Sequence, residues 1–245
     1  MDQIAKAFEK RVGKAIRYRA EVQTIRHGEN HVAVTYKDTA SGKFTTVNAD
    51  YCLCTIPLSV LRMIETDFSP RFKAAIKQVA YAPVGKIGLQ MKRRFWEEDD
   101  QIYGGHVLTD IKGINTISLP SSNWQKQKGV LLGYYNYQTS AIEVSAMTPA
   151  ERAEFAVAAG EKIFPAYRES FESAFSVAWH RVQYNLGGWA DWNEESRKHA
   201  YPVLLEGEGR VLLAGEHLSY LTGWQAGAIE SAWQQLAKIH ERASA

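Results

Sequence analysis

The spacing of apolar residues predicts a helix near the start of the chain and a small antiparallel sheet after it. Residues 3–12 place apolar side chains on one helical face, at Ile4, Ala5, Phe8 and Val12. From Ala15 the apolar period changes to two, as in a strand with one buried face. Turn residues at 28–30 and 41–42 separate further alternating segments. The pattern over residues 15–47 therefore predicts an antiparallel meander.

The middle of the chain alternates between predicted strands and predicted helices. An apolar run over residues 51–56 stops at Pro57, which predicts a short buried strand before a helical stretch. Thr148 and Pro149 are a typical N-cap and first helical residue, so a helix is expected from there to about Ile163. A further helix is predicted over 70–80, and strands are predicted at 84–92, 102–108, 114–119, 129–136 and 175–182.

The C-terminal segment has the order strand, glycine-containing loop, helix. Residues 211–214 form an apolar strand, Gly215 to Gly223 form the loop, and a helix is predicted to continue through Ile239. A helix start after such a loop presents free N–H groups and a partial positive charge, which suits an electron-rich ligand. An ordinary strand-to-helix turn has the same appearance. The whole pattern predicts a mixed α/β fold.

The composition narrows the class of protein. Hydrophobic residues make up 45% and charged residues 23%, as in a globular domain, and the net charge of +2 gives no sign of nucleic-acid binding. No apolar run approaches the roughly 20 residues that span a bilayer. Cys52 and Cys54 are too close for a disulfide framework or a zinc site, so no metal is expected. This cysteine usage favours a cytoplasmic protein, although the sequence leaves the compartment open.

Four segments occur in an order that resembles a known family. They are residues 85–99, 178–192, 211–217 and 222–233. Together they resemble the C-terminal half of flavin-dependent amine oxidases, and most closely the L-amino-acid oxidase branch. The most specific matches are Tyr184, the Gly187-Gly188-Trp189 turn and the Gly223-Trp224 pair, with support from residues 1–3, Val22 and residues 55–57. The resemblance covers nearly the whole chain.

The resemblance implies a catalytic role for Lys86. This residue looks like the family's active-site lysine, which holds a water near the flavin N5 atom. Its apolar neighbours Val84, Ile87 and Leu89 predict partial desolvation and a lowered pKa, which suits proton transfer or oxygen activation. The alternative is a surface lysine at the start of a strand.

The resemblance also implies a bound FAD and the residues that hold it. Glu216 looks like the acidic residue near the ribityl–pyrophosphate region, with capping of the following loop as its alternative role. The loop and helix start resemble the segment that meets the N1–C2=O edge of the flavin. Val22 matches a contact to adenine, and the remaining cofactor-binding residues are Trp179, Tyr184, Gly223, Trp224, Gln225, Ala226, Gly227 and Ala228. Val22, Trp179 and Tyr184 could equally be core residues.

Trp189, Gly223 and Trp224 match positions around the family's substrate pocket. Two indoles would form an apolar slot for a bulky side chain, or for a cationic one. No cysteine lies in the glycine turn, so the FAD is expected to be non-covalently held. L-amino-acid oxidases place a tyrosine before a proline to bind the substrate carboxylate, whereas Leu119 precedes Pro120 here. Tyr134 or Tyr135 could replace it.

The resemblance divides the chain into three segments. Residues 1–80 and 206–245 are expected to belong to a discontinuous FAD-binding domain, and residues 81–205 to a mixed-sheet substrate domain. No GxGxxG motif follows a predicted strand. We therefore expect a C-terminal portion that works with the family's N-terminal half, in the same protein or as a separate chain. Alone it should bind FAD weakly or not at all, and it should aggregate or need a partner. An oligomer is also expected.

The leading functional hypothesis is oxidative deamination of an L-amino acid. The complete enzyme would transfer hydride to flavin N5 and give a keto acid, ammonia and, with molecular oxygen, hydrogen peroxide. Two alternatives remain within the family: an amine or polyamine oxidase, and an amino-acid 2-monooxygenase. A third alternative is a non-catalytic binding or assembly module.

Overall fold

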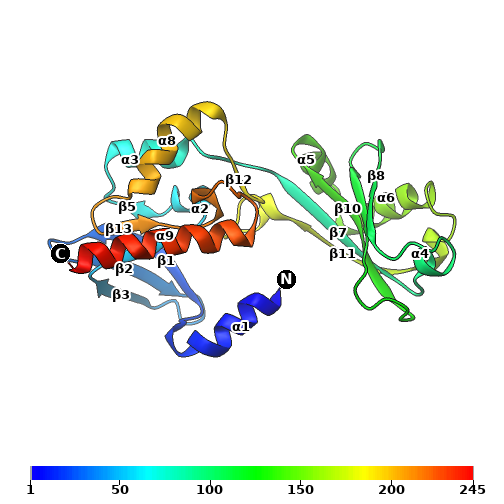
Figure 1. Ribbon diagram of the computed structural model, residues 1–245, viewed down its shortest axis with the longest axis horizontal. Coiled ribbons are helices and arrows are strands. Elements are labelled where there is room, and N and C mark those ends of the chain that lie inside the picture. Colours follow the sequence, from blue (N-terminus) through cyan, green and yellow to red (C-terminus); the bar gives the residue numbers. More distant parts are fainter. Residues whose placement is uncertain (1, 245) are drawn as a thin grey trace. The chain divides into compact units, whose positions relative to one another are not determined.

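The computed structural model describes residues 2–244 and shows the predicted mixed α/β fold. The chain forms two compact units (Figure 1). The first combines the segments before Ala80 and after Trp192, and the second consists of Ala80–Trp192. Residues 193–205, which the sequence analysis placed in the substrate domain, group with the first unit. No helix within residues 2–244 has the length and apolar character needed to cross a membrane.

The first unit contains the predicted helix and meander. Helix α1 covers Asp2–Val12, and the sheet has the order β3-β2-β1-β5. Its first strand begins at residue 20 and not near residue 15, because Gly13–Ala15 form a 3-10 turn (η1) and Arg19 has a left-handed φ of 58°. The strands are β1 (Ala20–His27), β2 (Val32–Asp38), β3 (Phe44–Ala49) and β5 (Glu65–Thr66).

A second layer of this unit is built on a parallel pair of short strands, β4 (Cys52–Cys54) and β13 (Val211–Leu213). All of β13 is buried, and helix α8 packs against both this strand and α3. The expected strand at 51–56 and both helices after it are therefore present. The helices of this unit are α2 (Leu58–Leu61), α3 (Pro70–Lys77), α8 (Glu194–Glu206) and α9 (Gln225–Ser244).

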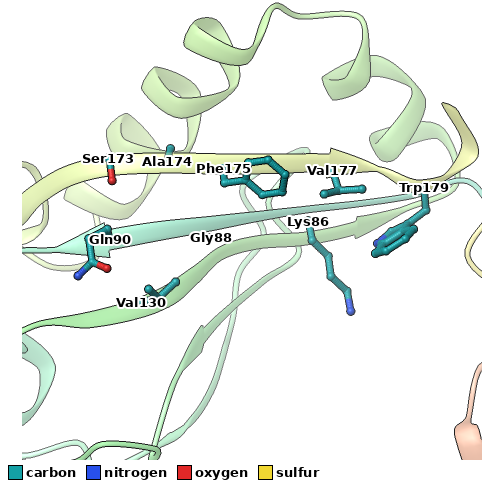
Figure 2. Close-up of a pocket in the computed structure, with 9 residues that line it drawn as sticks. All are labelled: Lys86, Gly88, Gln90, Val130, Ser173, Ala174, Phe175, Val177 and Trp179. Atoms are coloured by element: carbon teal, nitrogen blue, oxygen red, sulfur yellow. The ribbon is translucent and has the colours of Figure 1, made fainter. Parts of the chain in front are cut away.

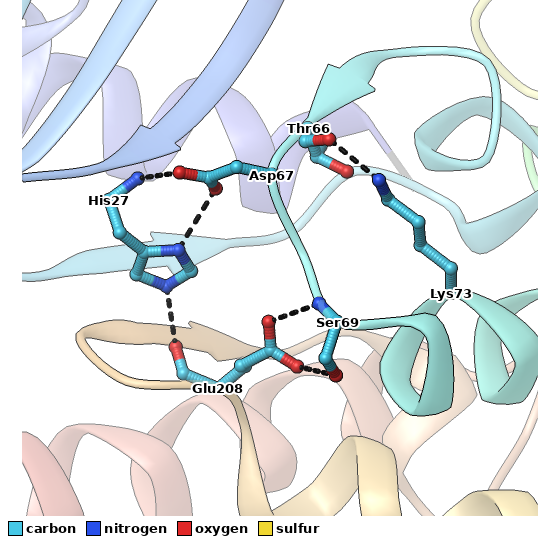
Figure 3. A network of polar contacts seen from close by, with 6 residues as sticks. All are labelled: His27, Thr66, Asp67, Ser69, Lys73 and Glu208. Atoms are coloured by element: carbon cyan, nitrogen blue, oxygen red, sulfur yellow. Dashed lines mark hydrogen bonds and ion pairs between the residues drawn. The ribbon is translucent and has the colours of Figure 1, made fainter.

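A polar network joins the meander to the second layer (Figure 3). The Nδ1 atom of His27 lies 2.9 Å from Asp67 Oδ1, and its Nε2 atom lies 3.0 Å from the carbonyl oxygen of Glu208. The Asp67 carboxylate and the Glu208 carbonyl are both hydrogen-bond acceptors, so the ring links the two segments. The carboxylate of Glu208 accepts from the backbone and the hydroxyl of Ser69, the N-cap of α3.

The second unit is a five-stranded sheet of order β11-β7-β10-β9-β8. All its predicted strands are present, but the last one runs over residues 171–178 and not 175–182, because its antiparallel ladder with β7 ends at Ala178. The strands are β7 (Val84–Met91), β8 (Gly105–Leu108), β9 (Thr116–Leu119), β10 (Gly129–Tyr137) and β11 (Phe171–Ala178).

The chain enters and leaves the second unit through a short ladder. Strand β6 (Ala80–Tyr81) pairs antiparallel with β12 (Ala190–Asp191).

Helices cover one face of the five-stranded sheet (Figure 1). The helices of this unit are α4 (Phe95–Glu98), α5 (Thr139–Ser145), α6 (Pro149–Glu161) and α7 (Tyr167–Ser170). The predicted Thr148 cap of α6 is part of a capping box with Glu151. The core under α5 and α6 includes Ile87 and Leu89 of β7. Because side chains alternate along a strand, Lys86, Gly88 and Gln90 lie on the opposite face.

Candidate functional site

Lys86 lies on the face of β7 that the helices do not cover (Figure 2). Its cross-strand partners are Tyr135 on β10 and Val177 on β11. The ammonium nitrogen is 4.3 Å from the centre of the Tyr135 ring, a cation–π distance. Burial lowers the pKa of Lys86, because the charged form loses hydration while the ring only partly replaces it. The predicted desolvated lysine is therefore present.

A trough of about 360 Å³ runs along this face from Lys86. Gly88 forms its middle, where the absence of a side chain leaves room between Lys86 and Gln90 (Figure 2). The other lining residues come from β10, β11 and the 3-10 turn η2 (Trp179–Arg181), and they are Val130, Ser173, Ala174, Phe175, Val177 and Trp179. The volume falls within the range of small-molecule sites.

The glycine turn at 187–189 lies against the segment that leads into β7. Added Cβ atoms would collide with Tyr81 at Gly187 and with Val84 at Gly188. The Gly188 N–H donates to the Ala82 carbonyl at 2.8 Å, and the Ala82 N–H donates to the Trp189 carbonyl at 3.0 Å. The turn thus fixes Trp189 beside the start of the strand that carries Lys86, whereas Tyr184 is exposed.

The first unit positions the residues of the C-terminal loop. Glu216 accepts a hydrogen bond from the Gly223 N–H at 2.8 Å. Gly223 has a φ of +78°, which few other residues adopt easily. The Ser231 hydroxyl bonds both the N–H and the carbonyl of Gly215. This bond is of the capping kind that the sequence analysis gave as an alternative role for Glu216.

The start of helix α9 is exposed. Trp224 is 69% exposed, and Gln225 and Ala226 are exposed as well. The first N–H groups of a helix have no partner within it, and they carry a partial positive charge. By contrast, Gly227 is buried, and a Cβ there would collide with Ser219 and Leu221. The close approach expected at Gly227 is thus made by the protein's own loop. The Ala228 N–H donates a hydrogen bond to the Trp224 carbonyl at 3.3 Å.

Two further candidates, Val22 and Tyr134, lie on strands β1 and β10. Val22 is half-buried on β1 opposite Tyr36, next to a bulge in the ladder. Tyr134 is 1% exposed and belongs to the core, so it cannot reach a substrate carboxylate; of the two tyrosines considered, only Tyr135 accompanies Lys86.

The structure therefore forms two groups, each within one unit. Lys86, Trp179 and Trp189 belong to the second unit, whereas Glu216 and the start of α9 belong to the first. Within residues 2–244, no cluster of side chains could hold a metal ion. The sequence analysis missed Gln90, Ser173 and Phe175 as lining residues. Gln90 could have been found from the sequence, because side chains alternate along a strand and Gln90 therefore shares a face of β7 with Lys86 and Gly88.

Comparisons with known proteins show which family this chain resembles. The model of the family described as flavin-containing amine oxidoreductase matches residues 1–239. The flavin-dependent L-tryptophan oxidase RebO of Lentzea aerocolonigenes is 33% identical over 95% of this chain and 50% of its own length. An L-amino-acid oxidase of Siganus canaliculatus is 28% identical over 98% of this chain and 46% of its own length.

A solved structure of a redesigned putrescine oxidase superimposes with a TM-score of 0.85 at 16% identity, over 99% of this chain and 53% of that one. This chain spans about half the length of the curated relatives it matches. The match of the family model over nearly the whole chain shows that this protein belongs to the flavin-containing amine oxidoreductase family.

Proposed function

We propose that this chain is part of an FAD-dependent enzyme that oxidises L-amino acids to keto acids. Relatives named as L-amino-acid oxidases support the substrate class. The observation that carries the proposal is Lys86, a desolvated amine at the end of a trough lined mainly by apolar residues. A lysine that only served solubility would lie exposed in water.

The residues present fit one edge of a flavin. The exposed start of α9 offers N–H groups and a partial positive charge for the N1–C2=O edge, and Gly223 allows close approach of the backbone before it. Val22, Trp179, Tyr184 and Glu216 remain proposed contacts of the same cofactor.

The FAD would be held without a covalent bond. Cys52 and Cys54 lie on β4, and burial raises the pKa of Cys54 to about 12, so its nucleophilic thiolate form is suppressed. The glycine turn beside β7 has no cysteine.

The bound FAD would accept the hydride from the substrate Cα. The residues of this chain would prepare that transfer. Lys86 would hold a water at Nζ, and its lowered pKa makes a neutral amine more accessible for moving a proton. Trp189 of the second unit and Trp224 of the first remain proposed substrate contacts. The balanced overall reaction converts the amino acid, oxygen and water to a keto acid, ammonium and hydrogen peroxide.

The complete site would need more polypeptide than residues 1–245. We propose that a segment equivalent to the other half of the relatives completes the FAD site, in the same protein or as a separate chain. An oligomeric assembly is proposed as well.

The test is a product assay on the complete, flavin-loaded protein. Incubation with each common L-amino acid should yield peroxide, keto acid and ammonium in equal amounts. An amide product would instead indicate an amino-acid 2-monooxygenase, and turnover of amines or polyamines alone would indicate an amine oxidase. A protein that binds no flavin under any of these conditions would be a binding or assembly module, and the proposal would be wrong.

A further inference from the structure

The end of the trough remote from Lys86 has its own polar group, the side-chain amide of Gln90. We propose that this end is a subsite for an aromatic side chain with a neutral hydrogen-bond donor, and specifically for the indole of tryptophan. The proposal rests on the proposed function, because it assigns a side-chain preference to the same site.

The orientation of the Gln90 amide is determined by its partners. Its Nε2 atom donates to the carbonyls of Met91 at 3.1 Å and Gly129 at 3.3 Å. Two carbonyl acceptors require the NH₂ group on that side, so the amide cannot be flipped. The Oε1 atom accepts no hydrogen bond from any residue between 2 and 244, and Figure 2 shows it on the side facing Gly88. The far end of the trough therefore presents a fixed acceptor.

The walls favour a flat apolar body. Phe175 stands 75% exposed on β11 opposite Gly88, and Val130 lies across β7 on β10. A glycine between an exposed phenyl ring and an aliphatic side chain leaves a slot into which an aromatic ring can insert. A ring bound there would cover the apolar surface of Phe175, which water otherwise contacts.

The charges favour a neutral donor over a cation. Among the residues between 2 and 244, no aspartate or glutamate lines the trough, and the charged group that lines it is the ammonium of Lys86. A distal ammonium or guanidinium would lose hydration and meet a like charge, without an anionic partner. An indole N–H loses little hydration and gains the Oε1 acceptor.

The length of the trough favours a substrate with a long side chain. Lys86 and Gln90 are four residues apart on one strand, which corresponds to about 13 Å between their Cα atoms. An amino acid whose reacting carbon lies near Lys86 can reach Gln90 only with an extended side chain. Alanine or valine would leave the far end filled with water.

The test compares ligands that differ only in the indole N–H. In the complete, flavin-loaded protein, kcat/KM for L-tryptophan should exceed that for 1-methyl-L-tryptophan by about two- to tenfold, the value of one neutral hydrogen bond. Gln90→Leu should reduce this ratio to about one. The matched control is Gln127→Leu, at an exposed position of the same unit, which should keep the wild-type ratio.

A binding measurement separates this inference from the proposed function. Indole-3-propionate has no amino group to oxidise. Calorimetry should show that it binds more tightly than its 1-methyl derivative, which lacks the indole N–H. Equal affinity for its 1-methyl derivative in the wild-type protein would overturn the subsite, even if amino acids are oxidised. Binding that depends on the N–H without oxidation of any amino acid would leave the subsite standing and refute the proposed function.

A second variant covers the case in which Gln90→Leu does not fold. Phe175→Ala removes an exposed side chain and should weaken both indole ligands by the same factor, with the N–H preference intact. Unchanged affinity for both ligands in Phe175→Ala would contradict the proposed slot.

Discussion

At the scale of the residue, Lys86 provides the most direct test of the chemistry. Lys86→Met in the complete enzyme should lower kcat/KM by about a hundredfold or more, because a positioned proton-transfer group contributes on that order. The melting temperature should stay the same or rise, since burial penalises the charged ammonium that methionine removes.

The control for that variant is Lys92→Met, an exposed lysine just after the same strand. Steady-state peroxide production at saturating oxygen measures both variants. Wild-type kinetics in Lys86→Met would show that this amine has no part in the reaction.

His217 predicts how stability depends on pH. Burial lowers the pKa of His217 from 6.5 to about 4, because its site does not accommodate an imidazolium. Between these two values the unfolded chain binds a proton that the folded chain does not, so stability rises with pH through this window and falls as the pH drops from about 6.5 to 4. The loss can reach about 3 kcal/mol.

Urea unfolding at pH 7 and pH 5 measures this effect. His217→Gln should flatten the dependence, whereas the exposed control His199→Gln should keep it. If the free energy of unfolding fell equally from pH 7 to pH 5 in the wild-type and His217→Gln proteins, other groups would cause the pH dependence.

The sequence predicted the surroundings of some residues but not of others. The half-buried state of Lys86 followed from its apolar neighbours in an alternating strand. The sequence did not show whether Tyr134 or Tyr135 lies beside Lys86. A bulge in β10 between Leu132 and Tyr134 changes which side chains face the core. The contacts of Gly227 were also beyond prediction, since they come from a loop whose path depends on Gly215 and Gly223.

At the scale of the element, Arg197 on α8 holds the loop before α9. Its guanidinium carbon lies 4.5 Å and 4.7 Å from the ring centres of Tyr201 and Tyr220, and it donates to the Ser219 carbonyl at 3.1 Å. Arg197→Met keeps the aliphatic stem and should reduce stability by about 1–3 kcal/mol through the lost cation–π and hydrogen-bond contacts.

Limited proteolysis supplies the second measurement for Arg197. Cleavage within residues 215–224 should become faster in Arg197→Met than in Lys198→Met, the exposed neighbour on the same helix. Equal cleavage rates would show that the loop is held by its internal bonds, such as that between Glu216 and Gly223, and not by α8.

Most elements followed from the apolar period, and the exceptions have local causes. Helix α8 was not predicted because Pro202 lies inside it and its first turns are polar; the Asn193–Ser196 capping box was the signal that could have revealed it. Strand β8 begins at residue 105 and not 102, since Gly104 and Gly105 both have positive φ values. Such backbone conformations are hard to infer from the apolar pattern alone.

At the scale of the whole molecule, two helices have apolar faces that the described residues do not cover. On α9 the exposed positions are Ile229, Trp233 and Leu236, and on α1 they are Ile4, Phe8 and Val12. Trp233 is 75% exposed. The isolated chain should therefore self-associate with increasing concentration, because soluble monomers rarely keep such continuous apolar surface in water.

Light scattering of the isolated chain measures this association. Trp233→Glu should lower the apparent mass at a given concentration, whereas Gln234→Glu, one position further along the helix, should not. A monomeric wild-type chain at high concentration would contradict the prediction.

The ladder between β6 and β12 has a consequence for how the second unit could be exchanged for that of a relative. Because the polypeptide leaves and rejoins the first unit at adjacent paired strands, the sheet bearing Lys86 and Gln90 is joined to the rest of the chain at one place. A homologous segment with the same bounds should therefore be exchangeable at that junction while the first unit keeps its own sequence.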